Sequence, residues 1–541
     1  MTHATMCDPK RLPLGRSGFS DIRQNHMIYV DKTDFVAKLA DLRQPIFFSR
    51  PRRFGKSLLV NTLHSLFAHG LDDFHGLALE KIWNDTTYHV AHFDFSRFTG
   101  KNASDFKYAL SYKILQELAT SDTSSQFHEQ HFQYPDLILD KLLASVTSNA
   151  FVLLIDEYDA PITHRLDKPH ELDDIIAILN DFYATIKQYS DKFRFIFITG
   201  ITRISNISLF STFNNLLDLS LSKEFNTILG FTKNDLQKYF KIYSKNAATY
   251  LQMTYEEVDS RLEQYYDGFQ FSLETEETVY NPWSILNFYA HPSDGFYNYW
   301  FASGGFSTLL MQYLKVNKSF NLLNYQDREI FIEKYKIFDR YDIANIPSNI
   351  LLLQTGYFTL RKETESIVRL VFPNTEVEDS MLRVFLTANN LEPSINSYHK
   401  LQNLEKFIDD KNLQEIVNSF NAILNDCVSN NANIFEDERS IRDIIYAAIP
   451  QNISLQKIKE RETAKGRSDL ELVTRKTNMV IEFKRIKQNR DARASLSEAI
   501  RQIESKRYGI KPFNHRSLYR VAMVVSTQDK LILQEFCQEV F

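Results

Sequence analysis

The segment with the clearest chemical signal is residues 50–57, which read Arg-Pro-Arg-Arg-Phe-Gly-Lys-Ser. It follows an apolar run at 46–48 and precedes a helical pattern of leucines that stops at Gly70. Between a strand and a helix, such a segment forms a loop whose backbone N–H groups bind phosphate oxygens. Arg50 stands where the usual pattern begins with glycine, so this loop must start differently. A basic loop that only caps a helix is the alternative. The residues expected to bind a nucleotide here are Arg52, Arg53, Phe54, Gly55, Lys56 and Ser57.

Two carboxylates at the end of a second apolar run complete this chemistry. Residues 151–157 read Phe-Val-Leu-Leu-Ile-Asp-Glu. Asp156 is expected to bind Mg²⁺ together with the Ser57 hydroxyl, while Lys56 reaches the β- and γ-phosphates. Glu157 points the other way along the strand, where it would polarise an attacking water. A strand that simply ends in a charged turn is the alternative, but the two features in this order predict an ATP site.

A third apolar run, residues 193–199, ends in two further polar candidates. Thr199 at the end of the run is placed to contact the γ-phosphate. Arg203 is placed to neutralise charge in the transition state. A structural salt bridge is an equal alternative for Arg203.

Near the C-terminus a second group of residues has the composition of a metal-dependent hydrolytic site. Asp469 opens one expected strand, and Glu482 and Lys484 close the next. Because side chains alternate along a strand, Glu482 and Lys484 share one face. Two carboxylates can hold Mg²⁺ or Mn²⁺, and the lysine can orient or deprotonate a metal-bound water aimed at a phosphodiester. A solvated strand face is the alternative interpretation.

The elements that must position these residues indicate an α/β fold. Apolar strands alternate with helices up to about residue 230, a pattern typical of a parallel sheet covered on both faces. We therefore expect a parallel-sheet domain at 1–230 and a mostly helical middle or lid region at 231–375. A helical lead-in and a smaller α/β domain are expected at 376–541, with the core of that domain at about 440–541.

Charge is distributed unevenly along the 541 residues. The chain has a net charge of −5, which taken alone argues against a nucleic-acid binder. Residues 451–520, however, hold 18 Lys and Arg against 8 Asp and Glu, and this excess surrounds the C-terminal candidate site. A phosphate backbone is a reasonable partner for it, although a solvated face would explain it too.

The ends and the cysteines exclude other classes. The N-terminus has no apolar signal segment, and no apolar run approaches the roughly 20 residues of a membrane helix. Three scattered cysteines encode neither a disulfide framework nor a zinc site. We expect a cytoplasmic protein, or one exported into a host without a cleavable signal.

Taken together, the motifs resemble the AAA-ATPase-like family of bacterial ATPases, whose members usually carry a C-terminal domain of the PD-(D/E)XK nuclease superfamily. The resemblance covers nearly the whole chain, and a basic lead-in to the phosphate loop is typical of the family. The matching segments are residues 12–19, 29–33, 50–57, 153–161, 199–203, 266–269, 280–284, 355–357 and 373–374.

For the C-terminal domain, the resemblance assigns Asp469, Glu482 and Lys484 to the core motif of the superfamily. It matches Gln502 and Tyr508 to a helix motif that follows. It also implies a carboxylate on the helix before the core, where Asp443 stands without the histidine that often accompanies it.

Two functions follow as hypotheses. In the first, the protein hydrolyses ATP and cleaves DNA or RNA at a metal-dependent site. In the second, the ATPase is a conformational or signalling switch, and the nuclease-like domain only binds. A protein partner or a homo-oligomer is compatible with both, because arginines of related ATPases often act across subunits.

Overall fold

The architecture comes from a computed structural model. It describes residues 10–98, 102–120, 125–166, 168–205, 213, 215–302, 310, 330–342, 345–388, 393–428, 438–450, 455–459, 462–463, 466–486, 492–506, 508, 516–529 and 531–540. Over these residues the chain forms two compact units. The first holds residues up to 290 and most of 299–377, and the second holds 291–298 and 378–541. The expected division of the chain at 230 and 375 stays a prediction.

A five-stranded parallel sheet forms the centre of the first unit, in the order β2-β3-β4-β1-β5. Every residue of β3 and β4 is buried, which explains why these strands read as continuous apolar runs. The parallel α/β sheet expected from the sequence is confirmed. The strands are β1 (Ile46–Ser49), β2 (His89–Asp94), β3 (Phe151–Asp156), β4 (Phe193–Gly200) and β5 (Leu217–Asp218).

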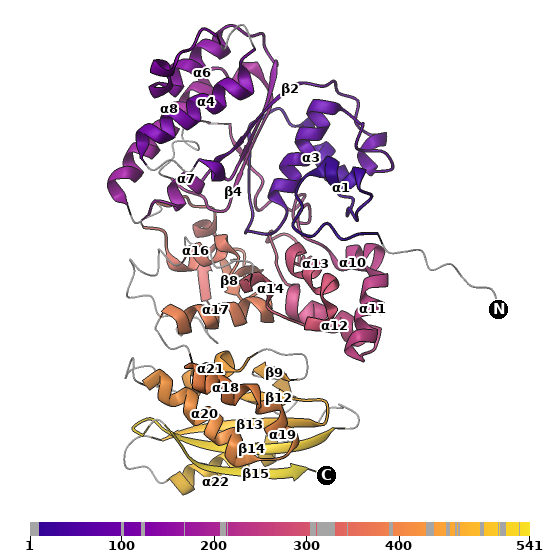
Figure 1. The fold of residues 1–541 in the computed structure, drawn as a ribbon, viewed down its shortest axis with the longest axis vertical. Coiled ribbons are helices and arrows are strands. Elements are labelled where there is room, and N and C mark those ends of the chain that lie inside the picture. The colour runs from indigo at the N-terminus through magenta and orange to yellow at the C-terminus, as the bar shows by residue number, and fades with distance from the viewer. Residues whose placement is uncertain are drawn as a thin grey trace, which may run out of the picture. The chain divides into compact units, whose positions relative to one another are not determined.

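Helices pack on this sheet in two groups (Figure 1). Helices α4, α6 and α8 lie together on one side, and α1 and α3 lie on the other. The Asn102 side chain caps α4 by accepting the N–H of Asp105. Prolines lie in the first turn of α6, α7 and α8, where a missing N–H removes no hydrogen bond of the helix. The helices are α1 (Phe19–Gln24), α2 (Thr33–Asp41), α3 (Lys56–His69), α4 (Ala103–Leu118), α6 (Pro135–Ala144), α7 (Ala160–Thr163) and α8 (Pro169–Gln188).

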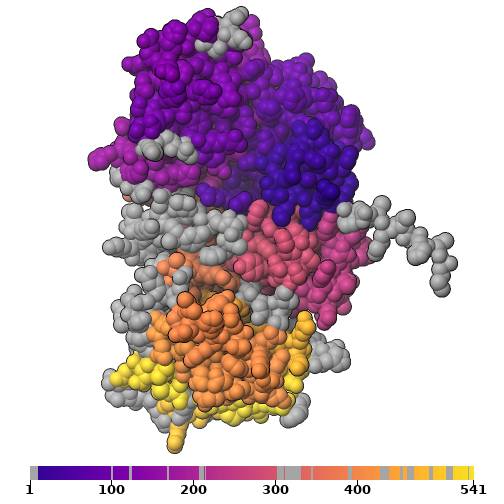
Figure 2. All heavy atoms as spheres, viewed as in Figure 1, coloured from indigo at the N-terminus to yellow at the C-terminus, as the bar shows by residue number. Residues whose placement is uncertain are grey.

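Where the structure describes it, the middle region, residues 231–375, is mainly helical, and apart from 291–298 its described residues belong to the first unit. Figure 2 shows its pink segment directly against the indigo N-terminal residues. Its helices are α10 (Lys233–Tyr239), α11 (Lys241–Leu251), α12 (Tyr255–Tyr266), α13 (Pro282–Ala290), α14 (Tyr299–Ala302), α16 (Ser348–Thr355) and the start of α17 (Thr375–Ala388). The structure adds a small antiparallel sheet that the sequence did not indicate, in the order β6 (Ile330–Glu333), β8 (Ile367–Val371), β7 (Thr359–Lys362).

The second unit is built around a mixed sheet in the order β15-β14-β13-β12-β9. Strands β13 and β14 are parallel, and the other neighbours are antiparallel. The strands are β9 (Gln456–Lys459), β12 (Leu470–Val473), β13 (Thr477–Ile486), β14 (Ser517–Ser526) and β15 (Leu531–Val540), beside a short pair, β10 (Glu462–Thr463) and β11 (Gly466–Arg467). The hairpin expected around residues 474–478 is present as β12 and β13.

Helices complete the second unit. Before the sheet come α18 (Ile395–Gln402), α19 (Leu404–Asp409), α20 (Leu413–Val428) and α21 (Glu438–Ala448), and after β13 comes α22 (Ala492–Lys506). Helix α22 packs against β13 and β14. Among the helices that the structure describes, none has the length and apolar character needed to cross a bilayer.

Candidate functional sites

The loop between β1 and α3 has the form of an anion-binding loop. Gly55 caps α3 with a φ of 97°, a left-handed conformation that suits glycine. Lys56 is buried, and its Nζ donates to the carbonyl oxygens of Arg50 (2.8 Å) and Pro51 (3.0 Å). Burial lowers the pKa of Lys56. The lysine is therefore folded back over the loop at the N-terminus of a helix, where an anion is favoured.

Arg50 explains how the loop begins without a glycine. Its backbone is not left-handed, so a side chain is tolerated at this position. The guanidinium lies between the rings of Phe48 (4.3 Å to the centroid) and Phe271 (4.1 Å). It also donates to the carbonyl oxygens of Ser220 and Phe225. Arg50 is thus a buried structural residue that fixes the start of the loop through these contacts.

Asp156 and Glu157 lie at the end of β3, beside the loop. The Ser57 side chain hydrogen-bonds to Asp156, and the Glu157 N–H donates to Asp156 Oδ1 at 2.9 Å. Burial raises the pKa of both carboxyl groups. A hydroxyl beside a desolvated carboxylate is a donor set that suits Mg²⁺, whose charge would offset the cost of ionising a buried carboxyl.

The residues expected at the end of β4 are held by protein contacts. The Thr199 hydroxyl donates to the Phe48 carbonyl oxygen at 2.6 Å. Arg203 is buried, lies 3.2 Å from Asp218 and donates to the Ile337 carbonyl oxygen at 2.7 Å. Of the two interpretations of Arg203, the geometry favours the structural salt bridge.

Sequence analysis did not identify the residues that fix the end of β4, Tyr158 and Asp159. Asp159 Oδ2 accepts the N–H groups of Ile201 (3.1 Å) and Thr202 (2.8 Å), and the Tyr158 hydroxyl donates to the Thr202 carbonyl oxygen (2.9 Å). A Cβ at Gly200 would lie 2.5 Å from the Tyr158 ring, so glycine is required there. A third acidic residue, two positions after Glu157, was the available signal.

A cavity of about 590 Å³ opens over the phosphate loop. This volume is in the range of small-molecule sites. The middle region supplies part of its wall, so the cavity is completed by residues far from the loop in sequence. It is lined by residues 52–59 and Glu157, by Ile28, Tyr29 and Val30, by residues 228–231, and by Phe240, Pro282, Trp283 and Leu286, among others.

Residues of the middle region also pack directly against the loop between β1 and α3. The Phe54 ring packs edge-on against Phe269 (4.8 Å between centroids) and Phe271 (5.3 Å). Gly356 has a φ of 86°, and a Cβ there would lie 2.7 Å from Pro51. Two of the segments that carried the resemblance, 266–269 and 355–357, thus each place a residue against this loop.

In the second unit, Asp469, Glu482 and Lys484 come together as expected. The register pairs Leu470 with Ile481, which places Asp469 beside Glu482. Asp469 Oδ2 accepts the N–H of Phe483 at 2.8 Å, and Lys484 Nζ lies 3.6 Å from Glu482 Oε1. Burial and the charge of Asp469 raise the pKa of Glu482 to about 8.

This pair of carboxylates fits a divalent cation. Glu482 Oε2 is buried and has no hydrogen-bond partner. A buried acceptor without a partner is costly, and two neighbouring carboxylates repel each other. A cation between them would relieve both penalties. Within the described residues, no cluster of three or more His, Cys, Asp or Glu with metal-binding geometry is found.

The acidic residue of helix α21 that approaches this site is Glu438, which sequence analysis missed. Glu438 Oε2 lies 3.5 Å from Lys484 Nζ, and its Oε1 accepts the N–H of Arg485 at 3.1 Å. Asp443, expected to act here, is buried in ion pairs with Arg442 (2.9 Å) and Lys459 (3.5 Å). Glu438 stands on the same helix, five residues earlier, and its acidity was the only signal.

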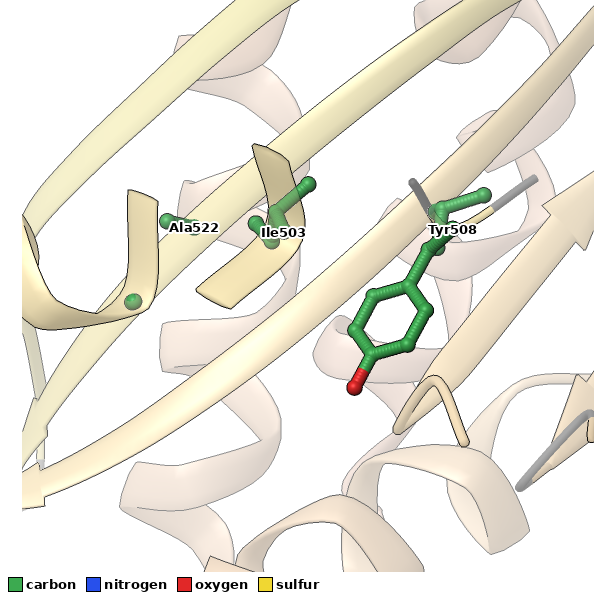
Figure 3. Close-up of a cluster of buried hydrophobic side chains, with 5 residues drawn as sticks. Ile503, Tyr508 and Ala522 are labelled. Carbon is green, nitrogen blue, oxygen red and sulfur yellow. The ribbon is translucent and has the colours of Figure 1, made fainter. Parts of the chain in front are cut away.

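Gln502 and Tyr508 lie close together at the C-terminal end of helix α22. Gln502 Nε2 donates to the Tyr508 hydroxyl at 3.4 Å. Figure 3 shows the Tyr508 ring on the same side of the sheet as Ile503 and Ala522, in one apolar cluster. The cluster includes Val480, which shares a strand face with Glu482 and Lys484. The apolar contacts of α22 therefore support the face that carries the candidate site.

Part of the basic stretch at 451–520 lies outside the described residues, namely 451–454, 460–461, 464–465, 487–491, 507 and 509–515. Within the described part, Lys457 is buried and forms an ion pair with Asp379 at 3.4 Å, so its charge does not contribute to the surface. Arg501 and Lys506 lie exposed on α22, together with Arg493. The described part of the stretch therefore contributes both an internal ion pair and positive charge at the surface.

Comparisons with known proteins agree with this geometry. Residues 13–210 match a family model described as "Predicted AAA-ATPase". Residues 436–535 match a model of the PD-(D/E)XK nuclease superfamily. The chain is also similar to an "Uncharacterized protein in vnfD 5'region" of Azotobacter chroococcum mcd 1, with 28% identity over 515 residues that cover 93% of each protein.

Proposed function

Because this chain carries an AAA-ATPase-like domain and a domain of the PD-(D/E)XK nuclease superfamily, we propose that it hydrolyses ATP and cleaves DNA or RNA with a divalent metal ion. The observation that supports this best is the presence of two separate, desolvated acidic sites, each next to a lysine. One joins Asp156 and Glu157 to Lys56, and the other joins Asp469 and Glu482 to Lys484.

In the ATPase site, the loop 52–57 would bind the phosphates through its N–H groups. Lys56 Nζ would exchange the carbonyl oxygens of Arg50 and Pro51 for phosphate oxygens. Ser57 and Asp156 would hold Mg²⁺, which neutralises phosphate charge when bound. Glu157 would accept a proton from the attacking water, and its raised pKa makes it a stronger base for that step. Thr199 would lie near the γ-phosphate.

In the nuclease site, Asp469 and Glu482 would hold Mg²⁺ or Mn²⁺, which when bound supplies an acidified water and stabilises charge on the phosphate. Lys484 would orient that water and donate to a phosphate oxygen. We assign Glu438 to the first-helix position for which the sequence suggested Asp443, because Glu438 contacts Lys484 and Asp443 is paired elsewhere. The basic residues of 451–520 would bind the nucleic-acid backbone.

One experiment tests both halves of the proposal. The purified full chain is incubated with ATP, Mg²⁺ or Mn²⁺, and end-labelled single- and double-stranded DNA and RNA. Lys56→Ala should abolish binding of a fluorescent ATP analogue, and Glu482→Ala and Lys484→Ala should abolish cleavage. Lys38→Ala and Glu504→Ala remove similar charges from exposed positions of the same units and should leave both activities intact.

Unchanged affinity for the analogue in Lys56→Ala would exclude the phosphate-loop assignment. Cleavage at the wild-type rate in Glu482→Ala would exclude the nuclease site.

An ATP-dependent switch is the second candidate. It is favoured by the contacts of the middle region with the phosphate loop, since a nucleotide in the cavity would touch both. Here the nuclease-like unit would bind a nucleic acid or protein partner without cutting. Nucleotide binding with full biological activity in Asp469→Ala would support the switch.

A further inference from the structure

We propose that Arg53 is the arginine that neutralises transition-state charge in the ATPase site, and that Trp283 of the middle region positions it. This inference rests on the proposed ATP hydrolysis. It gives Trp283, and with it the segment 280–284, a defined place in the reaction.

Two other arginines close to the loop are committed to the fold. The Arg50 guanidinium is buried between Phe48 and Phe271. Arg203 is buried in its ion pair with Asp218. Neither can reach the cavity without breaking contacts that hold the ends of β1 and β4. Arg52 and Arg53, by contrast, both line the cavity.

The backbone of Arg53 is held in a rarely adopted conformation. Its φ is 69°, in the left-handed region, where a residue with a Cβ is strained. Such strain persists where the surrounding structure imposes it, and it is found most often at functional sites. In this conformation the Arg53 guanidinium lies 4.4 Å from the centroid of the Trp283 ring. The charge of Glu157 acts on Arg53 as well, which relates the arginine to the proposed water-activating carboxylate.

Trp283 is a rigid platform for this contact. Its backbone N–H donates to Asn281 Oδ1 at 2.9 Å, at the start of α13. Its indole Nε1 donates to the Tyr299 carbonyl oxygen at 3.3 Å. Both ends of the residue are therefore fixed within the middle region. A guanidinium stacks on an aromatic ring through its flat face, so the ring fixes the plane in which its N–H donors point.

The chemical step defines what Arg53 would contribute. The water oxygen forms a bond to the γ-phosphorus, and the bond from that phosphorus to the bridging oxygen breaks. ADP leaves with the electron pair, and one water proton passes to Glu157. Negative charge is spread over the γ-phosphoryl oxygens during transfer, and a correctly placed guanidinium stabilises that charge more than it stabilises bound ATP.

Steady-state kinetics of the full chain with Mg²⁺ and ATP test the assignment. Arg53→Ala should lower kcat about 1,000-fold, the low end of the known contribution of such arginines, and change ATP affinity less than about tenfold. Arg52→Ala removes the same charge one residue away, and it should raise KM without reproducing the loss in kcat.

Trp283 is tested as a positioning residue by a pair of variants. Trp283→Phe keeps an aromatic face and should retain most of kcat, whereas Trp283→Leu should lose a large part of it. In the double variant, Arg53→Ala with Trp283→Leu, kcat should match that of Arg53→Ala alone, because the tryptophan acts only through the arginine.

Binding of ADP with Mg²⁺ and aluminium fluoride, a mimic of the phosphoryl group in transfer, gives a readout without turnover. Arg53→Ala should bind ADP with the wild-type affinity but should no longer bind the complex of ADP with aluminium fluoride. The inference is overturned if Arg53→Ala keeps the wild-type kcat and still binds the mimic, or if Arg52→Ala lowers kcat as much as Arg53→Ala does. It is also overturned if the double variant loses the product of the kcat losses of Arg53→Ala and Trp283→Leu. Failure of Lys56→Ala to lose ATP binding would instead overturn the proposed function.

Discussion

Glu482 is 2% exposed, and burial together with the nearby Asp469 raises the pKa of its carboxyl group to about 8. Without a cation, Glu482 therefore retains a proton near neutral pH. In the unfolded chain the same group ionises at its ordinary pKa of about 4.3. Because the pKa of Glu482 differs between the folded and the unfolded chain, proton binding and metal binding at this residue both affect the stability of the second unit.

The sign of this linkage gives a prediction. Between about pH 5 and pH 8 the folded protein holds a proton that the unfolded chain lacks, so the free energy of unfolding should fall as pH rises. Urea unfolding in EDTA at pH 5, 6.5 and 8 measures this dependence. Glu482→Gln cannot ionise and should flatten it.

Mn²⁺ affinity should change in the opposite direction. Binding displaces the proton, so the affinity should rise with pH up to about 8. An affinity that is independent of pH would contradict the assignment of Glu482 as a ligand.

At the same scale, residue patterns identified Asp469, Glu482 and Lys484 because strand alternation and a hairpin bring them together by local geometry. They did not distinguish Asp443 from Glu438, since both are acidic residues of one helix. Only the packing of α21 against β13 decides which side chain reaches Lys484. Arg50 was ambiguous for a similar reason, because its partners at 220, 225 and 271 are distant in sequence.

At the scale of elements, the buried strands of both sheets were predictable because continuous apolar runs have few other interpretations. Strands β6, β7 and β8 were not predicted. They are short and half-exposed, and they lie within a largely helical region. Strand β15 was missed as well, since it is an edge strand whose apolar run is interrupted by pairs of polar residues.

The contact between α16 and the phosphate loop supports a prediction at this scale. Gly356 ends α16, and Gly356→Ala would place a Cβ 2.7 Å from Pro51. We expect this variant to lower both the melting temperature and ATP affinity. Gly76→Ala is the matched control, because Gly76 has a φ of 77° with nothing within 4 Å. The control should lose about 1 kcal/mol of stability from backbone strain and keep its ATP affinity. Equal ATP affinity in the two variants would contradict a role for this contact.

At the scale of the whole molecule, the protein consists of two compact units, and one candidate site lies in each. The sequence indicated both sites and the order of the folds. It did not show that most of the middle region shares a compact unit with the five-stranded parallel sheet, because that grouping depends on contacts of residues such as Phe54, Phe269 and Gly356.

Separate sites in separate units predict separate responses to ligands. In differential scanning calorimetry, Mg²⁺ and ATP should raise the melting temperature of one transition, by the equivalent of about 2.7 kcal/mol at 100 times the dissociation constant. Mn²⁺ without nucleotide should raise the other. Lys56→Ala should lose only the first response and Glu482→Ala only the second. Loss of both responses in one variant would contradict the assignment of one site to each unit.

The setting of Arg50 has a consequence for how such chains can diversify. Its ring contacts come from β1 and from Phe271 in the middle region. An exchange of middle regions between relatives would leave this arginine buried beside a foreign surface. The phosphate loop and the segment that carries Phe271 should therefore be inherited together.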